Sequence, residues 1–204
     1  MKISWKKTCV GAVALLLALP AFAQQSAKES EREAGTLDQY EKLLKPADMH
    51  EILGRFVGSW QADMKIIRYG TPPVEDKAKE TVDARWILND RFVEADYTLG
   101  YGGGSSKGKI LLGYNGATKQ FTRYNLIDWD SRGTFSTGIY IRKQNSIVFR
   151  GTELDPVSGD SFERREVFTF GPDKDKIHYQ QFYVFADGTE IKPVEGYYVR
   201  VKKE

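Results

Sequence analysis

The sequence predicts an all-β protein: an antiparallel up-and-down β-barrel of about ten strands, preceded by a short N-terminal helix. Three observations lead to this fold class. Hydrophobic residues alternate with polar ones, with a period of two, from Trp60 to the end of the chain. Turn-forming residues interrupt this alternation at short intervals, and no helical pattern returns after Gly58. Consecutive strands are therefore expected to pair as hairpins, and closing them into a barrel leaves no exposed edge strand.

The N-terminus, residues 1–23, has the pattern of a signal peptide. Three lysines precede an apolar stretch, residues 9–19, that is too short to span a bilayer. Pro20 breaks this stretch and argues against an uncleaved anchor, and Ala21-Phe22-Ala23 forms an A-x-A cleavage site. We therefore expect cleavage after Ala23 and a periplasmic or secreted protein. No later segment is long and apolar enough to be a transmembrane helix, so no membrane span is predicted.

The remaining chain divides into a polar, helical leader over residues 24–46 and a single barrel domain over residues 47–204. The leader carries a helical stripe between Leu37 and Leu44, and Pro46 ends it. The short helix that precedes the barrel is predicted from apolar residues at i, i+3, i+4 and i+7, and Gly58 is expected to end it; these residues are Met49, Ile52, Leu53 and Phe56.

Three of the predicted strands have a clear two-residue alternation, which groups side chains on one face. The groups are Val82, Ala84, Trp86 and Leu88; Val93, Ala95, Tyr97 and Leu99; and Phe135, Thr137, Ile139 and Ile141. Further strands rich in β-branched and aromatic residues are KQFTRYNLI, NSIVFRGTEL, FERREVFTF, KIHYQQFYVF and YYVRV. Turns are expected at Asn89-Asp90, Asn115-Gly116, Gly133, Gln144-Asn145, 156–159, 171–175 and Asp187-Gly188.

Composition excludes several classes of function. The 204 residues are 41% hydrophobic and 28% charged, with a formal net charge of +2, so no strong field is available to hold nucleic acid. One cysteine and two histidines exclude cysteine-rich zinc sites, iron–sulfur clusters and disulfide scaffolds. No cofactor and no metal site is predicted.

Four segments in a fixed order resemble a known family: MHEILGRFVGSWQADM, LLGYNGATKQFTRYNLIDWDSRGTFSTG, GTELDPVSGDSFERREVFTF and HYQQFYVFADGTEIKPVEGYYVRVKK. From His50 to the end, the chain resembles the DUF1579 family of bacterial proteins of unassigned function. The resemblance implies a calycin-like, or lipocalin-like, barrel, with Trp60 closing its bottom. It implies no reaction.

Two loop motifs match functional patterns only in part. Residues Gly103 to Lys109 read G-x-x-x-x-G-K, but Ile110 stands where a phosphate-binding loop needs Ser or Thr, and a strand-like segment follows where a helix is required. A hairpin loop is the expected structure. Asp128 to Gly133 begins like a calcium loop, but Arg132 occupies a ligand position, so a polar hairpin is expected there as well.

The histidines offer little chemistry by themselves. His50 and His178 lie far apart in the sequence and make no metal site. A barrel haem with His178 as its axial ligand is an alternative, but a structural or solvent-facing role for this histidine is favoured. No G-x-S-x-G motif supports nucleophilic catalysis.

The aromatic residues and one arginine give the candidate site. Tyrosine and tryptophan combine an apolar body with a polar tip, which suits a pocket wall. Arg123, Arg164 and Arg165 lie in strands; the latter two must face opposite sides, and an inward arginine needs a partner or an anionic ligand. The predicted ligand-binding residues are Trp86, Tyr97, Tyr124, Arg164, His178 and Tyr183.

The leading hypothesis from the sequence is a binding protein for a small apolar or amphipathic molecule, with an arginine available for an acidic head group. Two alternatives stay open. An enzyme would need an inward acid–base pair, such as His178 with a neighbouring carboxylate. A structural envelope protein would have a filled barrel and an exposed apolar patch.

Overall fold

The structure is a computed structural model, which describes residues 35–36, 48–68, 72–155 and 158–202. The predicted signal peptide, 1–23, lies outside the described residues, and so does the leader, 24–46, apart from residues 35 and 36. Cleavage after Ala23 and the leader helix therefore stay predictions. The fold described below belongs to the compact unit formed by residues 46–204.

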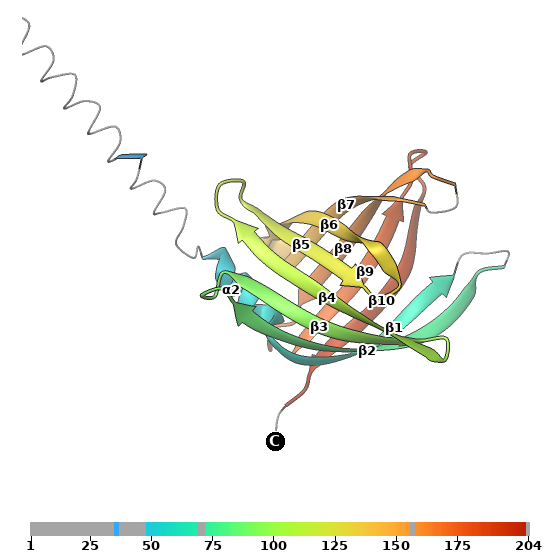
Figure 1. The fold of residues 1–204 in the computed structure, drawn as a ribbon, viewed down its shortest axis with the longest axis horizontal. Helices are drawn as coiled ribbons and strands as arrows, with labels where there is room; N and C mark the ends of the chain where they lie inside the picture. The colour runs from blue at the N-terminus through green and yellow to red at the C-terminus, as the bar shows by residue number, and fades with distance from the viewer. Residues whose placement is uncertain (1–34, 37–47, 69–71, 156–157, 203–204) are drawn as a thin grey trace, which may run out of the picture. The chain divides into compact units, whose positions relative to one another are not determined.

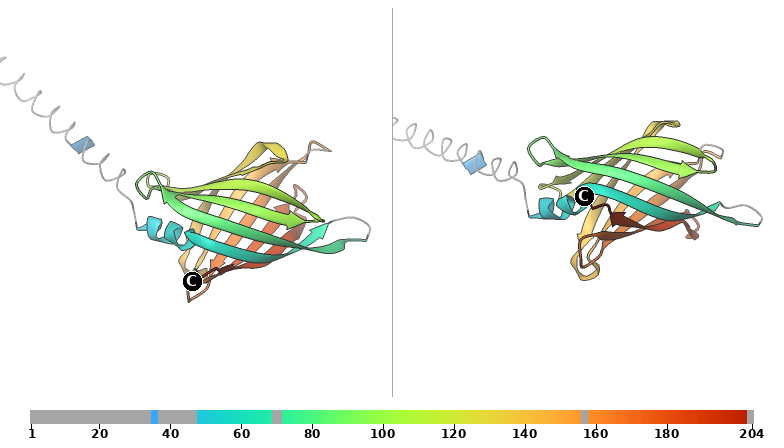
Figure 2. Two further views of the ribbon diagram at one scale, coloured as in Figure 1. Left: turned by 60° about the horizontal axis from the view of Figure 1, so that its bottom comes forward. Right: turned by 90° about the horizontal axis from the view of Figure 1, so that it is seen from below.

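Ten antiparallel strands form a closed barrel, as the sequence predicts, and each strand pairs with its neighbours in the chain (Figures 1 and 2). Strand β1 pairs with β10 and closes the ring, so each of the ten described strands has a partner on both sides. The strands are β1 (Gly58–Arg68), β2 (Val74–Ile87), β3 (Phe92–Tyr101), β4 (Gly104–Asn115), β5 (Gln120–Ile127), β6 (Asp130–Ile141), β7 (Ser146–Leu154), β8 (Ser161–Phe170), β9 (Lys176–Val184) and β10 (Glu190–Arg200).

The two ends of the barrel differ. The connections β1–β2, β3–β4, β5–β6, β7–β8 and β9–β10 lie at one end, called the hairpin end here. The other end, called the helix end, carries the remaining four connections, the end of β10 and the short helices α2 (Met49–Leu53) and η1 (Gly54–Phe56) (Figure 1). A third short helix, η2 (Arg142–Gln144), belongs to the β6–β7 connection at this end.

The predicted leading helix is present but ends earlier than expected. One α-helical turn becomes a 3₁₀ turn at Gly54, and Gly58 already belongs to β1, with a positive φ of 126°. Leu53 has no exposed surface, and the Phe56 ring packs edge-on against Phe168 and Phe170. These apolar contacts fill the helix end of the barrel.

Trp60 lies at the helix end, where the family resemblance places it. It is 3% exposed, and its indole Nε1 donates a hydrogen bond of 2.8 Å to the carbonyl of Phe56. The guanidinium of Arg200 stacks over the ring, 4.1 Å from its centroid, and donates to the carbonyl of Val57. Trp60 therefore joins the first strand, the last strand and the helical segment.

The alternation predicted for β3 places Val93, Ala95 and Tyr97 in the barrel interior, and all three are buried. The group on β6 faces the opposite way, because Phe135 and Ile139 are about half exposed on the outer surface. Grouping by alternation was therefore possible from the sequence, but the direction of each group was not.

The turn predicted at Gly133 is wrong. Strand β5 ends at Ile127, β6 begins at Asp130, and Gly133 lies inside β6 with a φ of 62°. The register shifts here, since Asn125 pairs with Thr134 while Ile127 pairs with Asp130. The glycine accommodates the bulge that this shift creates.

The glycine-rich segment after β3 is a tight hairpin. Only Gly102 and Gly103 form the turn, both with positive φ, and β4 begins at Gly104. A strand follows the G-x-x-x-x-G-K pattern, as expected, so the helix N-terminus that would face a phosphate is replaced by β4.

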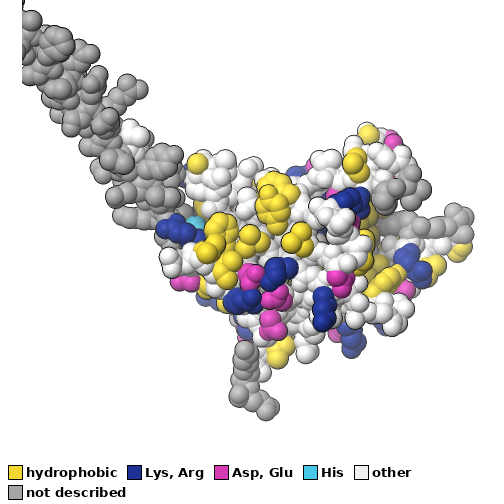
Figure 3. Space-filling model, in the orientation of Figure 1, with side chains coloured by type: hydrophobic (Ala, Val, Ile, Leu, Met, Phe, Trp, Pro, Cys, Tyr) yellow, Lys and Arg dark blue, Asp and Glu magenta, His cyan; other side chains and the backbone are white. Residues whose placement is uncertain are grey.

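The outer surface carries a patch of exposed apolar side chains over β5 and its neighbours, where Figure 3 shows hydrophobic side chains gathered. Its members on β5, β6 and their connection are Tyr124, Leu126, Trp129, Phe135 and Ile139.

None of the helices in the described ranges has the length and hydropathy needed to cross a bilayer.

Candidate functional site

A cavity of about 150 Å³ lies inside the barrel, in the half near the hairpin end. Its apolar wall consists of Met64, Ile66, Leu99, Ile110, Phe168 and Val194. Its polar wall consists of Glu80, Tyr97, Arg123, Asn125, Arg164, Tyr179, Gln181 and Tyr198. The cavity is therefore amphipathic: part of its wall is hydrocarbon and part can form hydrogen bonds.

Strand alternation brings the polar wall together. On β8, Arg164, Glu166 and Phe168 point into the barrel, whereas Arg165 points outward, where its guanidinium lies over the Phe182 ring. The predicted opposite orientation of the two adjacent arginines is therefore correct.

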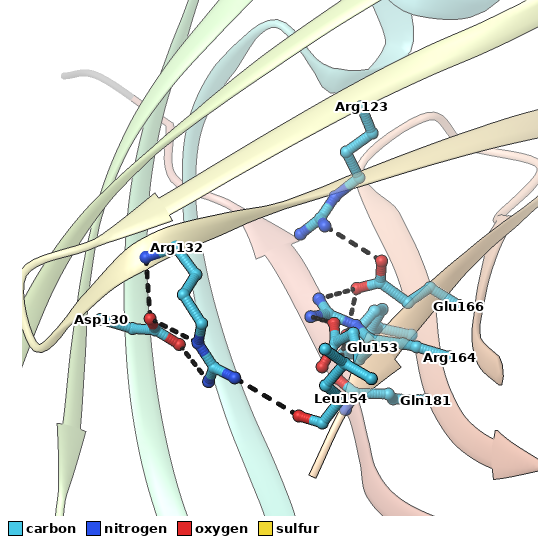
Figure 4. A network of polar contacts seen from close by, with 9 residues as sticks. Arg123, Asp130, Arg132, Glu153, Leu154, Arg164, Glu166 and Gln181 are labelled. Atoms are coloured by element: carbon cyan, nitrogen blue, oxygen red, sulfur yellow. Dashed lines mark hydrogen bonds and ion pairs between the residues drawn. The ribbon is translucent and has the colours of Figure 1, made fainter. Parts of the chain in front are cut away.

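Glu166 lies between two arginines (Figure 4). Arg123 Nη1 is 3.0 Å from Glu166 Oε2, and Arg164 Nη2 is 2.8 Å from Glu166 Oε1. Arg123 comes from β5 and Arg164 from β8, so the carboxylate joins two walls of the barrel. A buried charge needs such partners, since an isolated one would lose its hydration without compensation.

Two further side chains complete the group that we call the Glu166 network: Arg123, Arg164, Glu166, Tyr179 and Gln181. The Tyr179 hydroxyl oxygen lies 2.8 Å from Glu166 Oε1 and 2.9 Å from Gln181 Oε1. At the edge of the network, Arg164 Nη1 donates to Glu153 Oε1 at 2.6 Å.

The electrostatics of Glu166 follow from these contacts. Burial alone would raise the pKa of Glu166, but Arg123 and Arg164 outweigh it and hold the pKa at about 2. Burial raises the pKa of Tyr179 well above its ordinary value, and the neighbouring Glu166 charge adds to this effect. The network therefore holds an ionised carboxylate and a neutral phenol at neutral pH.

Glu80 is a second inward carboxyl, with a different environment. The Tyr198 hydroxyl donates to Glu80 Oε2 at 2.8 Å. Burial raises the pKa of Glu80 to about 7, against the lowering effects of the Tyr198 hydrogen bond and of Arg123, and with a smaller contribution from Glu166. Glu80 thus titrates near neutral pH, unlike Glu166.

A smaller void of about 50 Å³ lies between the 150 Å³ cavity and the helix end of the barrel. It is mostly apolar, and Phe56, Trp60, Ala84, Leu112 and Ile177 are among the residues that line it. Ile110, Arg123, Phe168 and Tyr198 line both spaces and form the layer between them. The smaller void has room for only a few water molecules.

The predicted site residues divide into three groups. Tyr97 and Arg164 line the cavity. Tyr183 shares their inward face, because it is the register partner of Arg164, and its ring packs on Phe162. Trp86 also points inward but lies at the helix end, where its ring is beside Gly54.

Tyr124 and His178 lie on the outer face and do not line the cavity. The Tyr124 ring packs on Phe135, with 4.6 Å between centroids, and Tyr124 is 51% exposed. The His178 ring stacks on Tyr197, and its Nε2 lies 2.9 Å from Glu195 Oε1. His178 therefore points away from the space that a barrel-bound haem would occupy, and its acid–base pair lies outside the barrel.

Sequence reasoning missed most of the polar wall, namely Glu80, Asn125, Tyr179, Gln181 and Tyr198. It also missed Glu166, the buried carboxylate that pairs with Arg123 and Arg164. The one available signal was the alternation Arg164, Glu166, Phe168 on a single face, which pairs a cation with a carboxylate two residues away. In the segment that begins like a calcium loop, Asp130 pairs with the guanidinium of Arg132, with 2.7 Å between Asp130 Oδ2 and Arg132 Nη2.

Known proteins give a fold and a family for this chain. A search among curated proteins found no match. Among solved structures, that of Rv2717c from M. tuberculosis is similar, with a TM-score of 0.55 over 78% of this chain and 100% of that chain, at 12% sequence identity. An identity this low shows a shared fold alone.

The family model described as a protein of unknown function (DUF1579) matches residues 45–200. This range contains the short helices, all ten strands and every residue of the cavity wall. The resemblance noted from His50 onward is thereby confirmed, and the chain belongs to the DUF1579 family.

Proposed function

We propose that the protein binds a small amphipathic molecule inside its barrel. The observation that carries this proposal is the 150 Å³ cavity, with its apolar wall and its hydrogen-bonding wall. Binding sites are commonly concave, mostly apolar spaces with a few convergent polar groups, and the cavity has this composition.

The cavity volume sets the size of the ligand. Drug-sized ligands occupy pockets of about 300–1,000 Å³, whereas an apolar cavity of about 150 Å³ in another protein holds benzene. A ligand of roughly six to ten non-hydrogen atoms fits this space. A larger hollow, of about 720 Å³, is lined in part by charged side chains such as Lys65 and Glu75, which are about half exposed.

Native mass spectrometry tests this proposal. The protein is purified from its own host, and its mass is compared before and after mild denaturation. We expect a reproducible additional mass that is lost on unfolding. A bare protein mass in both states, from several growth conditions, would contradict a tightly held ligand.

A matched pair of variants links the ligand to the cavity. Val194 lines the cavity, whereas Val199 on the same strand is 52% exposed on the outer face. Val194→Phe fills part of the cavity and should remove the bound mass, while Val199→Phe should retain it. Equal retention by both variants would place the ligand elsewhere.

One observation favours an enzyme as the second candidate. A carboxyl that titrates near neutral pH inside a cavity suits general acid–base catalysis, and Glu80 is such a group. If the barrel turns over its ligand, Glu80→Gln should abolish product formation while the bound mass persists. Unchanged turnover in this variant would remove Glu80 from the reaction.

We also propose that binding takes place after export from the cytoplasm. The basic residues, the apolar stretch and the A-x-A site of residues 1–23 support this location. The ligand would then come from the periplasm or from outside the cell.

A further inference from the structure

One donor on the cavity wall lacks an acceptor among the described residues, and a second guanidinium lies on the same wall. Arg164 uses Nη1 for Glu153 and Nη2 for Glu166, while its Nε is buried and has no hydrogen-bond partner among the described residues. Arg123 donates Nη1 to Glu166, and in Figure 4 its other terminal nitrogen points away from that carboxylate. A guanidinium has five N–H donors and no acceptor, so a ligand that satisfies these groups must supply acceptor oxygens.

The charges around the cavity depend on the state of Glu80. Arg123 and Arg164 carry two positive charges, and Glu166 and the partly buried Glu153 carry two negative ones. These four charges sum to zero, so the group as a whole is neutral when Glu80 is protonated. An ionised Glu80 adds a negative charge that an incoming anion would meet in a low-dielectric interior.

Few charged or titratable groups face Glu80. On the adjacent strands its register partners are Ala62 and Leu99, which carry no charge. The groups on other strands that affect its pKa are the Tyr198 hydroxyl on β10, Arg123 on β5 and Glu166 on β8. The charge of Glu80 in turn contributes to the raised pKa of Tyr97 on β3. Among the described residues, no lysine or arginine lies within 4.0 Å of the Glu80 carboxyl as an ion-pair partner.

We propose that the cavity takes a small monocarboxylate, held through its carboxylate by Arg123 and Arg164, and that it binds only while Glu80 is protonated. This inference rests on the proposed binding function and names its ligand class. Arginine matches a carboxylate with two parallel donors, and the apolar wall formed by residues such as Leu99 and Val194 holds the hydrocarbon part. The pKa of Glu80, at about 7, places the change in affinity within an accessible pH range.

Calorimetric titration with three molecules of similar shape tests the charge preference. Benzoate, neutral benzamide and cationic benzylamine are titrated into the whole protein at pH 6 and at pH 8. We expect benzoate to bind best, and to bind about tenfold more weakly at pH 8 than at pH 6, since one group of pKa near 7 must take up one proton. Benzamide should show no such pH dependence.

Two variants separate Glu80 from other titrating groups. Glu80→Gln keeps an acceptor for Tyr198 but cannot ionise, so its affinity for benzoate at pH 8 should equal its affinity at pH 6. Asp83→Asn removes a carboxylate from the outer face of the same strand, where it accepts from Ser59, and should retain the tenfold change. A tenfold change that persists in Glu80→Gln overturns the role of Glu80.

The remaining outcomes distinguish this inference from the proposed function. If benzylamine binds more tightly at pH 8 than at pH 6, the cavity has a cation site beside ionised Glu80, and the inference is overturned. Equal affinity for benzamide and benzoate at pH 6 would do the same and leave the binding function intact. If neither benzoate nor any straight-chain carboxylate from acetate to octanoate binds, the inference fails. If the host-purified protein also carries no ligand mass, the proposed function fails with it.

Discussion

At the scale of single residues, Glu166 pairs with the two arginines of the cavity wall, Arg123 and Arg164. Removing its charge would leave Arg123 and Arg164 facing each other in the interior without their shared counter-ion. We expect Glu166→Gln to lower the free energy of unfolding by about 3–5 kcal/mol, the usual cost of breaking a buried ion pair. Chemical denaturation at pH 7 measures the change.

The control for Glu166 lies on the same strand. Glu163 faces outward and pairs with Arg150, and both side chains are more than a third exposed. Glu163→Gln should change stability by less than about 1 kcal/mol, because water screens such pairs. Similar losses for the two variants would show that the Glu166 network contributes no special stability.

The pH dependence of this pair has a defined sign. The folded-state pKa of Glu166, about 2, lies below its ordinary value of 4.5, so its stabilising effect is complete above about pH 4.5 and is lost as the pH falls toward 2. Glu166→Gln removes this part of acid unfolding.

Glu80 predicts the opposite pH dependence. Its folded-state pKa, about 7, lies above the ordinary 4.5, so the folded protein retains a proton that the unfolded chain loses. Stability therefore falls as the pH rises from about 4.5 to 7. Glu80→Gln should be more stable than the native sequence at pH 8, by up to about 3 kcal/mol, but not at pH 4.5. Urea unfolding at both pH values tests this, with Asp83→Asn as the control; a gain equal at both pH values would show that the carboxyl is not destabilised by ionisation.

At the scale of elements, the short helical segment stabilises the helix end of the barrel. Leu53, on its last α-helical turn, has no exposed surface. Leu53→Ala should cost about 2–5 kcal/mol, because it leaves a void in a packed core. Leu126→Ala, at a leucine that is 54% exposed on β5, should change stability by no more than about 0.5 kcal/mol. Thermal unfolding of both variants compares them, and a similar Tm for the two would mean that the segment is dispensable.

Strand order and strand identity were predictable because each strand has a period of two and a turn signal at its end. The direction of each face was less so. On β9, Tyr179 and Gln181 point inward while His178 and Phe182 point outward, which reverses what hydrophobicity suggests for Gln181 and Phe182. The reason is that part of the interior near the hairpin end is polar. Gln181 has a hydrogen-bond partner there in Tyr179, whose hydroxyl also lies 2.8 Å from Glu166 on β8.

The same difficulty explains why Tyr124 was predicted as a site residue and Arg123 was not. Tyr124 and Arg123 are adjacent on β5, and a single-residue choice of register decides which of them enters the barrel. Arg123 is the one that enters, because Glu166 is there to receive it, and this partner is 43 residues away in the sequence. Alternation by itself cannot reveal such a pairing.

At the scale of the whole molecule, the cavity exists only because the barrel closes. The Glu80–Tyr198 hydrogen bond joins residues 118 positions apart and spans β1, which lies between their strands. The closed interior has an apolar part at the helix end and an amphipathic part, near the hairpin end, that holds the cavity. A ligand that contacts both walls would stabilise the folded barrel by RT ln(1 + [L]/Kd), so the gain rises with the logarithm of its concentration once the site is nearly saturated.

The last prediction concerns the mature form of the chain. A signal peptidase requires small residues before the cleaved bond, and Ala21 and Ala23 provide them. We expect the protein isolated from the periplasm or medium of a bacterial host to begin at Gln24, as intact mass and N-terminal sequencing would show. Ala23→Leu should cause the uncleaved precursor to accumulate, whereas Ala27→Leu, beyond the site, should leave processing unchanged. Recovery of the full chain from Met1 in the soluble cytoplasmic fraction, for all three sequences, would contradict export and place the ligand inside the cell.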